Sequence, residues 1–171
     1  SGNSPAEFFW DFGDGSPNVD ATSPSHLYPG PGSYTVTYTA ITSPWGYETV
    51  KTQIVNISDI PTADFKIVNA CQGKSVKLTN ATTIPSGVLS YEWNYGDGSP
   101  IFNTSSAAPI NKMYAVPNGY AVTLTASANG CTNAITKNVY TFARPVANFV
   151  KLQGNCDNEM YNFKNASTIP N

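Results

Sequence analysis

The eight residues "WDFGDGSP" at 10–17 return almost unchanged as "WNYGDGSP" at 93–100. Each copy carries a Trp, an aromatic residue two positions later, and then Gly-Asp-Gly-Ser-Pro. Glycine supplies the positive φ angles of a sharp turn, and aspartate accepts hydrogen bonds from nearby backbone N–H groups. A Trp in the strand before the turn can fill the space between two sheets. We interpret the stretch as a structural motif with these framework residues: Trp10, Gly13, Asp14, Gly15, Trp93, Gly96, Asp97 and Gly98.

The repetition extends well beyond this motif. Three further pairs of stretches recur 84 to 86 positions apart, close to the 83 positions of the motif: "GSYTVT" (32–37) with "NGYAVT" (118–123), "PTADF" (61–65) with "PVANF" (145–149), and "NATTIP" (80–85) with "NASTIP" (165–170). Together they define a unit of about 84 residues. The chain then contains the C-terminal part of one unit at 1–59, a complete unit at 60–143, and the N-terminal strands of a third at 144–171. The sequence therefore predicts a slice of a tandem array.

Composition and periodicity predict an all-β fold. Apolar residues make up 40% of the chain and charged residues 12%, with 13 Gly and 13 Pro as turn formers. Short stretches rich in β-branched and aromatic residues alternate in polarity, and the Asn129-Gly130 dipeptide predicts a hairpin turn. We expect about seven strands per unit, as in an immunoglobulin-like sandwich. The clearest strands are predicted at 33–42, 47–57, 63–68, 75–80, 89–95, 120–128 and 134–142.

Charge and hydropathy exclude several function classes. A net charge of −2 provides no basic surface for nucleic acid. No apolar run approaches the ~20 residues that a membrane-spanning helix needs, so we expect no membrane insertion of this segment. The chain begins at Ser1 without Met, and we expect it to be an excerpt of a longer protein. Pro61 and Pro145 fix the backbone at the joins between units, which predicts stiff linkers.

The motif resembles that of the PKD (polycystic kidney disease) domain. In the first unit Trp-Asp-Phe-Gly-Asp-Gly-Ser is followed by His26-x-Tyr28 and by Gly32-Ser33-Tyr34-Thr35-Val36. The second unit has Lys112-Met113-Tyr114 at the place of His26-Leu27-Tyr28. The resemblance covers the whole chain. It implies fibronectin-III-like sandwiches, arranged end to end, that serve as extracellular spacers or adhesion modules.

The acidic residues and the histidine raise two kinds of chemical site, a calcium site and a catalytic site. Asp11, Asp14 and Asp20 are calcium candidates because they carry hard oxygen ligands, but their order does not follow the ligand spacing of an EF-hand loop. We favour a turn-stabilising role for them and expect no cofactor. His26 is the sole histidine and becomes Lys112 in the second unit, and no known catalytic motif appears. We therefore expect no catalytic residues and no enzymatic activity.

The cysteines suggest an oxidising environment. Cys71 and Cys131 both fall in the complete unit, and a disulfide between them would close a loop of about 60 residues and stabilise the module by roughly 4 kcal/mol. The alternative is two reduced, buried thiols. Cys156 corresponds to Cys71 in the third unit, where its partner would lie beyond Asn171.

Trp45 is the one surface-contact candidate, because we expect "SPWGYE" (43–48) to form the tip of a hairpin. An exposed aromatic residue there could stack on a sugar or touch a partner. Packing against a neighbouring module or loop is the favoured alternative.

We expect stiffly joined sandwich modules to extend the protein and to have no chemical activity of their own. The resemblance to Cys-containing PKD arrays of Bacteroidota implies a filamentous cell-surface adhesin attached to the outer membrane, exported by type IX secretion and involved in gliding motility. Its expected partners are neighbouring modules, surface polysaccharide or another adhesion substrate, and, through distant regions, the motility and secretion machinery. One alternative is a set of accessory modules that engage polysaccharide or collagen in a secreted hydrolase. The other is a surface-layer protein or the ectodomain of a eukaryotic receptor.

Overall fold

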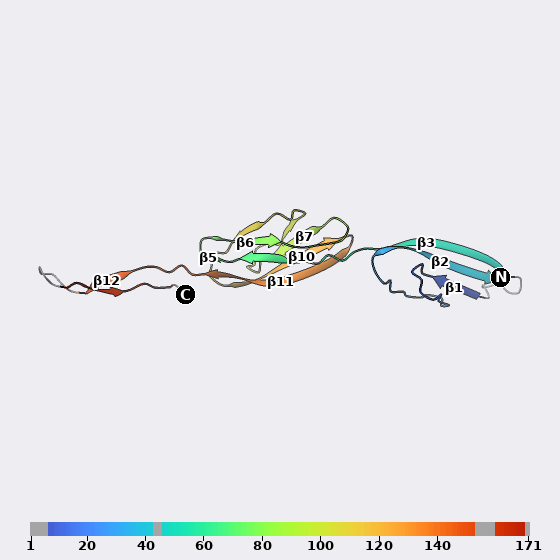
Figure 1. The fold of residues 1–171 in the computed structure, drawn as a ribbon, viewed down its shortest axis with the longest axis horizontal. Coiled ribbons are helices and arrows are strands. Elements are labelled where there is room, and N and C mark those ends of the chain that lie inside the picture. Colours follow the sequence, from blue (N-terminus) through green and yellow to red (C-terminus); the bar gives the residue numbers. More distant parts are fainter. Residues whose placement is uncertain (1–6, 43–45, 153–159, 170–171) are drawn as a thin grey trace. The chain divides into compact units, whose positions relative to one another are not determined.

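The computed structural model describes residues 7–42, 46–152 and 160–169, which form strands, turns and loops. The chain divides into two compact units, one of Ser1–Ile60 with Pro85–Gly87 and the other of Pro61–Ile84 with Val88–Asn171. Figure 1 shows three groups of strands along the chain, and each is described by itself below. Among the described residues there is no helix long and apolar enough to cross a membrane.

The complete module, at residues 61–142, contains a five-stranded sheet in the order β5-β11-β10-β7-β8. Neighbouring strands are antiparallel except for β5 and β11, which run parallel. The strands are β5 (Ala70–Cys71), β7 (Ser90–Asn94), β8 (Phe102–Thr104), β10 (Gly119–Ala128) and β11 (Cys131–Phe142).

A second sheet of three antiparallel strands, in the order β4-β6-β9, covers one face of the first. Its strands are β4 (Phe65–Val68), β6 (Ser75–Asn80) and β9 (Ile110–Met113). Burial alternates along β6, where Val76 and Leu78 are fully buried and Lys77 between them is exposed. This period of two is that of a strand with one face in a core and one in solvent.

Trp93 lies in the middle of the core between the two sheets. It is 1% exposed, and its ring meets that of Phe65 edge-to-face at a centroid distance of 5.1 Å. Val122 and Leu124 of β10 and Val139 of β11 complete the buried face of the larger sheet. Truncating a large aromatic residue in such a core costs about 3–5 kcal/mol, so the Trp is a main source of the module's stability.

The first unit contains one sheet, in the order β1-β2-β3. Its strands are β1 (Glu7–Asp11), β2 (Gly32–Thr42) and β3 (Tyr47–Ile57). Trp10 pairs with Tyr38 as Trp93 pairs with Leu124, so these strands correspond to β7, β10 and β11. Among the described residues of this unit, no strands correspond to β4 and β6.

Residues 146–169 contain a two-stranded antiparallel sheet of β12 (Phe149–Leu152) and β13 (Asn162–Asn165). Phe149 pairs with Asn165, as Phe65 pairs with Asn80 in the complete module. These two strands are therefore the counterparts of β4 and β6.

The all-β fold class predicted from the sequence is confirmed, and so is the hairpin across Asn129-Gly130, where Ala128 pairs with Cys131. Asn129 has a φ of 50° and Gly130 a φ of 83°, both in the left-handed region that such a turn requires. The sequence analysis did not identify the short strands β5, β8 and β9. Each has two to four residues, too few for alternation to show.

The predicted disulfide between Cys71 and Cys131 is wrong. Both cysteines are free, and Cys71 pairs with Phe142 at the last residue of β11, whereas Cys131 is the first residue of that strand. At about 3.3 Å per residue, eleven residues of strand separate the two positions by more than 30 Å. A disulfide requires Cα atoms within about 7 Å. The two cysteines belong to the same module but lie at opposite ends of β11.

Candidate functional site

The Gly-Asp-Gly turn of the first unit is held by its own side chains. Asp11 Oδ1 accepts a hydrogen bond from Gly13 N at 2.8 Å, and Asp14 Oδ1 accepts from Ser16 N at 3.1 Å and from Ser16 Oγ at 2.6 Å. Gly13 has a φ of 75°, and a Cβ atom on it would lie 2.4 Å from the carbonyl oxygen of Thr35. The backbone of the turn thus packs directly against β2, and there is no room for a side chain at Gly13.

The complete module builds the same turn with one change. Asn94 takes the place of Asp11, and its Oδ1 accepts from Gly96 N at 3.0 Å. Asp97 Oδ1 accepts from Ser99 N at 3.1 Å and from Ser99 Oγ. Because an amide oxygen replaces a carboxylate here without loss of the hydrogen bond, this position needs an acceptor and not a charge.

Each turn aspartate also contacts a basic side chain from the loop or strand that follows. In the first unit His26 Nε2 lies 2.7 Å from Asp14 Oδ2, and in the complete module Lys112 Nζ lies 2.8 Å from Asp97 Oδ2. Hydrogen bonds from Ser16 and His26 lower the pKa of Asp14 to about 2. Burial raises the pKa of Asp97, but the bonds from Lys112 and Ser99 outweigh it and bring that pKa to about 2 as well.

Stacked aromatic rings lie next to the turn in both units. Phe12 stacks on His26 at 4.0 Å, and Tyr28 stacks on Tyr34 at 4.3 Å. In the complete module the corresponding rings of Tyr114 and Tyr120 stack at 4.0 Å. These stacked rings hold the segment that carries His26 or Lys112 against the sheet.

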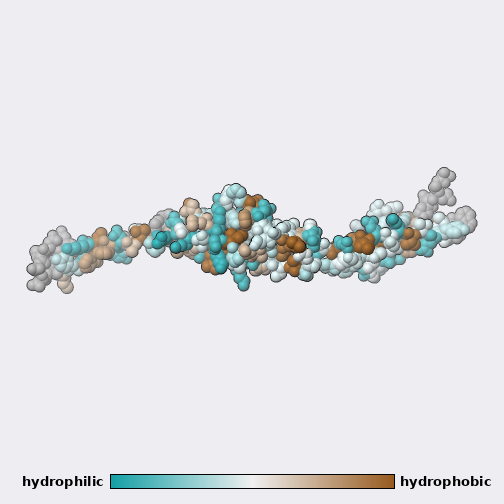
Figure 2. Space-filling view, turned by 90° about the horizontal axis from the view of Figure 1, so that it is seen from above, coloured by the Kyte–Doolittle hydropathy of each residue, from teal (hydrophilic) through white to brown (hydrophobic). Residues whose placement is uncertain are grey.

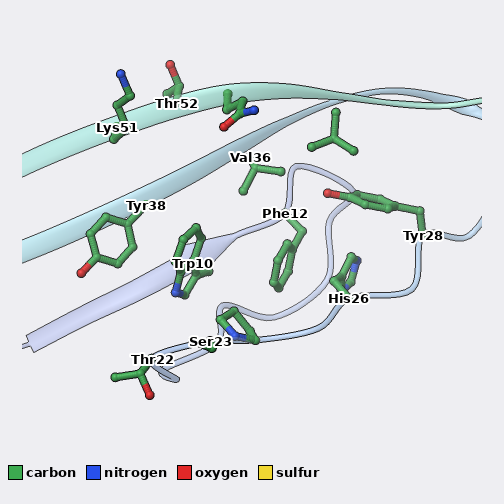
Figure 3. A pocket seen from close by; sticks show the side chains of 13 residues that line it. Trp10, Phe12, Thr22, Ser23, His26, Tyr28, Val36, Tyr38, Lys51 and Thr52 are labelled. Atoms are coloured by element: carbon green, nitrogen blue, oxygen red, sulfur yellow. The ribbon is translucent and has the colours of Figure 1, made fainter.

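A groove of about 590 Å³ lies between the sheet of the first unit and this loop. In Figure 3 the side chains of Trp10, Phe12 and Val36 point into the space between the strands and the loop that carries His26. The groove is largely apolar, and its lining includes Trp10, Phe12, His26, Tyr28, Val36 and Tyr38.

Comparison with known proteins identifies the two repeats. The family model described as "PKD domain" matches residues 1–57 and again residues 58–143. The chain belongs to the PKD domain family. Among solved structures, the PKD1 domain of Vibrio anguillarum Epp is similar, with 26% identity over 50% of this chain and 96% of that chain and a TM-score of 0.43. No curated protein matches the chain.

The complete PKD module explains the groove of the incomplete one. Trp93, Val122 and Val139, the counterparts of Trp10, Val36 and Val55, are 0–1% exposed beneath β4 and β6. Their counterparts in the first unit are only partly buried. The groove is therefore the core face of a PKD sandwich that lacks its covering strands, rather than a pocket shaped around a small ligand.

The calcium candidates of the first PKD unit do not converge. Asp11 and Asp14 accept hydrogen bonds within the turn, and Asp20 is exposed. Across the described ranges, no three His, Cys, Asp or Glu side chains come together as a metal site. Trp45 and Cys156 lie outside the described residues. The sequence analysis missed the bond of His26 to Asp14, although the exchange of His26 for Lys112 pointed to a basic side chain at this position.

Proposed function

We propose that this segment is a non-enzymatic, load-bearing stretch of the stalk of a very large filamentous cell-surface adhesin. PKD modules are typical of extracellular adhesion proteins and repeat arrays, and the family match in two consecutive repeats supports that setting. The observation that carries the proposal is the parallel pairing of β5, an early strand of the module, with β11, its last strand. This pairing determines the direction in which a pulling force loads the hydrogen bonds between the strands.

The chain enters and leaves the complete module at opposite ends of β11. Ala63 N, near the entry, donates to Asn133 Oδ1 at 3.0 Å, and Asn133 is the third residue of β11. The chain leaves after Phe142, the last residue of that strand. Nine residues of strand separate the two points by about 30 Å, so tension between entry and exit acts along the strand.

Near the exit, β5 lies parallel to β11. Gln72 N donates to Phe142 O at 2.7 Å, and Tyr140 N donates to Asn69 Oδ1 at 3.0 Å. Tension pulls β5 toward the entry and β11 toward the exit. The bonds between the two strands are therefore loaded in shear and must break together, whereas bonds at a hairpin end would open one by one.

A second link lies closer to the entry. Lys137 of β11 donates to the carbonyl oxygen of Phe65 at 2.7 Å and to Asp64 Oδ1 at 2.6 Å. It joins the first strand of one sheet to the last strand of the other. The entry segment is thus held to β11 at Asn133, Lys137 and Tyr140, at successive points along its length.

Single-molecule pulling on the full chain tests the load-bearing role. Asn69→Ala removes the acceptor for Tyr140 N, and Asn94→Ala is its matched control because it removes an Asn acceptor for Gly96 N, also at 3.0 Å and exposed. Each loses one hydrogen bond, worth about 1 kcal/mol. We expect Asn69→Ala to lower the unfolding force of the complete module well below that of Asn94→Ala. Equal forces in both variants contradict the proposal.

The cellular setting is tested separately. We propose outer-membrane attachment, export by type IX secretion and a part in gliding motility, with surface polysaccharide or another adhesion substrate as ligand. Antibody labelling of intact cells should detect the segment at the surface. Deletion of the encoding gene should reduce surface attachment and gliding. A parent protein with a catalytic domain beside a few modules, and no defect in attachment, would favour the accessory modules of a secreted hydrolase.

A further inference from the structure

The complete module separates its charges. Residues 61–142 contain five lysines and three acidic residues. Two of the lysines are bound to carboxylates within the module. Lys112 Nζ lies 2.8 Å from Asp97 Oδ2, and in the second pair Lys137 Nζ lies 2.6 Å from Asp64 Oδ1. The three lysines that form no ion pair with any residue in the described ranges are Lys66, Lys74 and Lys77. All three are exposed, so their charges are available to an anion from outside the module.

The register of the smaller sheet brings two of these lysines together. Lys66 of β4 pairs with Thr79 of β6, and Lys77 of β6 pairs with Val68 of β4. Residues that pair across two strands point to the same face of the sheet, so Lys66 and Lys77 are diagonal neighbours on the solvent face, about 7 Å apart. Lys74 immediately precedes β6. Three cations therefore lie on or beside one face of the module.

The same face carries groups that suit a hydroxyl-rich ligand. Its exposed residues are Lys66, Val68, Ser75, Lys77, Asn111 and Met113. Ser75 and Asn111 can each donate and accept hydrogen bonds. Val68 is 62% exposed and Met113 60%, and they offer aliphatic surface to the C–H groups of a sugar ring. In Figure 1 β6 lies at the top of the module, and Figure 2, seen from above, shows hydrophilic and hydrophobic residues intermixed on the module's surface.

The outer face of the larger sheet has a different character. The only lysine in its five strands is Lys137, which is bound to Asp64. Glu92 of β7 is exposed on the outer face, where it pairs with Thr125 of β10. The module thus has unpaired positive charge on the smaller sheet and a carboxylate on the larger one. Attraction for an anion is confined to the face formed by β4, β6 and β9.

The number and spacing of these lysines favour one kind of polyanion. A DNA-binding surface typically makes about 6–10 phosphate contacts, and proteins that bind single strands stack the bases on aromatic rings. Clusters that bind anionic lipid contain about 4–8 basic residues. The face has three lysines, and its six exposed residues include no aromatic ring. An acidic polysaccharide carries separated carboxylates with hydroxyl groups between them, as the face carries separated lysines with polar side chains between them.

We propose that the outer face of β4, β6 and β9 binds an acidic polysaccharide. Lys66 and Lys77 each contact a carboxylate of the ligand, Lys74 extends the positive field along the strand direction, and Ser75 and Asn111 bind hydroxyl groups. The inference rests on the proposed function, because it assigns a site and a charge to the polysaccharide that the adhesin would hold. Each contact is exposed and weak by itself, so affinity comes from several contacts along one polymer.

Surface plasmon resonance of the full chain over immobilised alginate, a polymer of uronic acids, tests the proposal. Dextran is the neutral reference. We expect binding to alginate and none to dextran, with an affinity that falls as salt is added, because exposed charges are screened. Lys66→Gln combined with Lys77→Gln should weaken binding about tenfold, since two charge contacts are lost. Lys66→Arg combined with Lys77→Arg keeps both charges and should bind like the wild type.

The matched control removes two lysines elsewhere in the chain. Lys51→Gln combined with Lys164→Gln gives the same change in net charge, and both lysines are exposed residues of strands, in β3 and β13. This control should bind alginate like the wild type. Thermal denaturation of all the variants should give closely similar midpoints, because every substituted side chain faces solvent.

The outcomes are distinct. Binding to alginate that the Gln pair in β4 and β6 weakens, and that the Arg pair and the control retain, supports the proposal. Equal weakening in the control overturns it, because attraction would then follow net charge and not this face. Tighter binding to duplex DNA or to phosphatidylserine vesicles overturns the choice of a polysaccharide. No binding to alginate also overturns the inference, but it leaves the load-bearing role intact, which the pulling experiment on Asn69→Ala tests separately.

Discussion

Gly96 lies so close to the backbone of Ala121 that a Cβ atom on it would be 2.4 Å from the Ala121 carbonyl oxygen. Gly13 has the same relationship to Thr35, also at 2.4 Å. Gly98, two residues after Gly96, has a similar positive φ, but a Cβ atom there would meet nothing within 4 Å. The two glycines of the motif are therefore required for different reasons.

The first prediction separates these reasons in the complete module. Gly98→Ala adds only backbone strain and should lower the free energy of unfolding by about 1–2 kcal/mol. Gly96→Ala adds a clash with a main-chain atom and should cost at least about 3 kcal/mol or prevent folding. Urea denaturation followed by circular dichroism measures both. Similar losses in the two variants would show that the close approach to Ala121 is unimportant.

The second prediction concerns the buried hydroxyl of Tyr114. Its OH donates to the carbonyl oxygen of Tyr95 at 3.0 Å, and the residue is 2% exposed. Tyr114→Phe leaves that buried carbonyl without its partner and should cost about 1–3 kcal/mol. Tyr120→Phe loses a comparable bond to Val116 O at an exposed site, where water can replace it, and should cost less. Equal losses by thermal denaturation would contradict this ranking.

The third prediction is acid destabilisation through Asp97. Its pKa is about 2 in the folded module, below the ordinary value of 3.8. Because the folded state binds the proton more weakly, the stabilisation is complete above pH 3.8 and is lost as the pH falls toward 2. It amounts to about 1–2 kcal/mol once solvent screening of a partly hydrated carboxylate is allowed for.

Asp97→Asn keeps a hydrogen-bond acceptor in the turn but removes the charge that Lys112 binds. Lys112→Met removes the cation instead. Both variants should be less stable at pH 7 and should lose less stability between pH 4 and pH 2 than the wild type. Urea titrations at these pH values provide the test. An unchanged slope in both variants would assign the acid sensitivity to other groups.

The fourth prediction follows from the separation of Cys71 and Cys131 along β11. Both thiols should react with an alkylating agent without reductant, as shown by peptide mass mapping. Cys71→Ser and Cys131→Ser should each change the free energy of unfolding by about 0.5 kcal/mol or less, instead of the roughly 4 kcal/mol expected for loss of a disulfide. Resistance of both thiols to alkylation would contradict the strand register.

The motif at 10–17 and 93–100 was readable from the sequence because its interactions are local. The acceptor two residues before each turn glycine, and the aspartate that binds Ser16 or Ser99, act within a few positions of the chain. Strands such as β6 and β10 can be recognised in the sequence because apolar and polar residues alternate along them, one face being buried and the other in contact with solvent. The all-β class followed from these local signals.

The sequence by itself thus determined the repeat, the strand faces and the acidic turn, because each depends on neighbours along the chain. Tertiary structure alone decided that Cys71 and Cys131 lie at opposite ends of β11, that His26 and Lys112 bind the turn aspartates, and that β5 runs parallel to β11. Those relationships join segments far apart in sequence, and they depend on how two sheets pair and pack rather than on any local pattern.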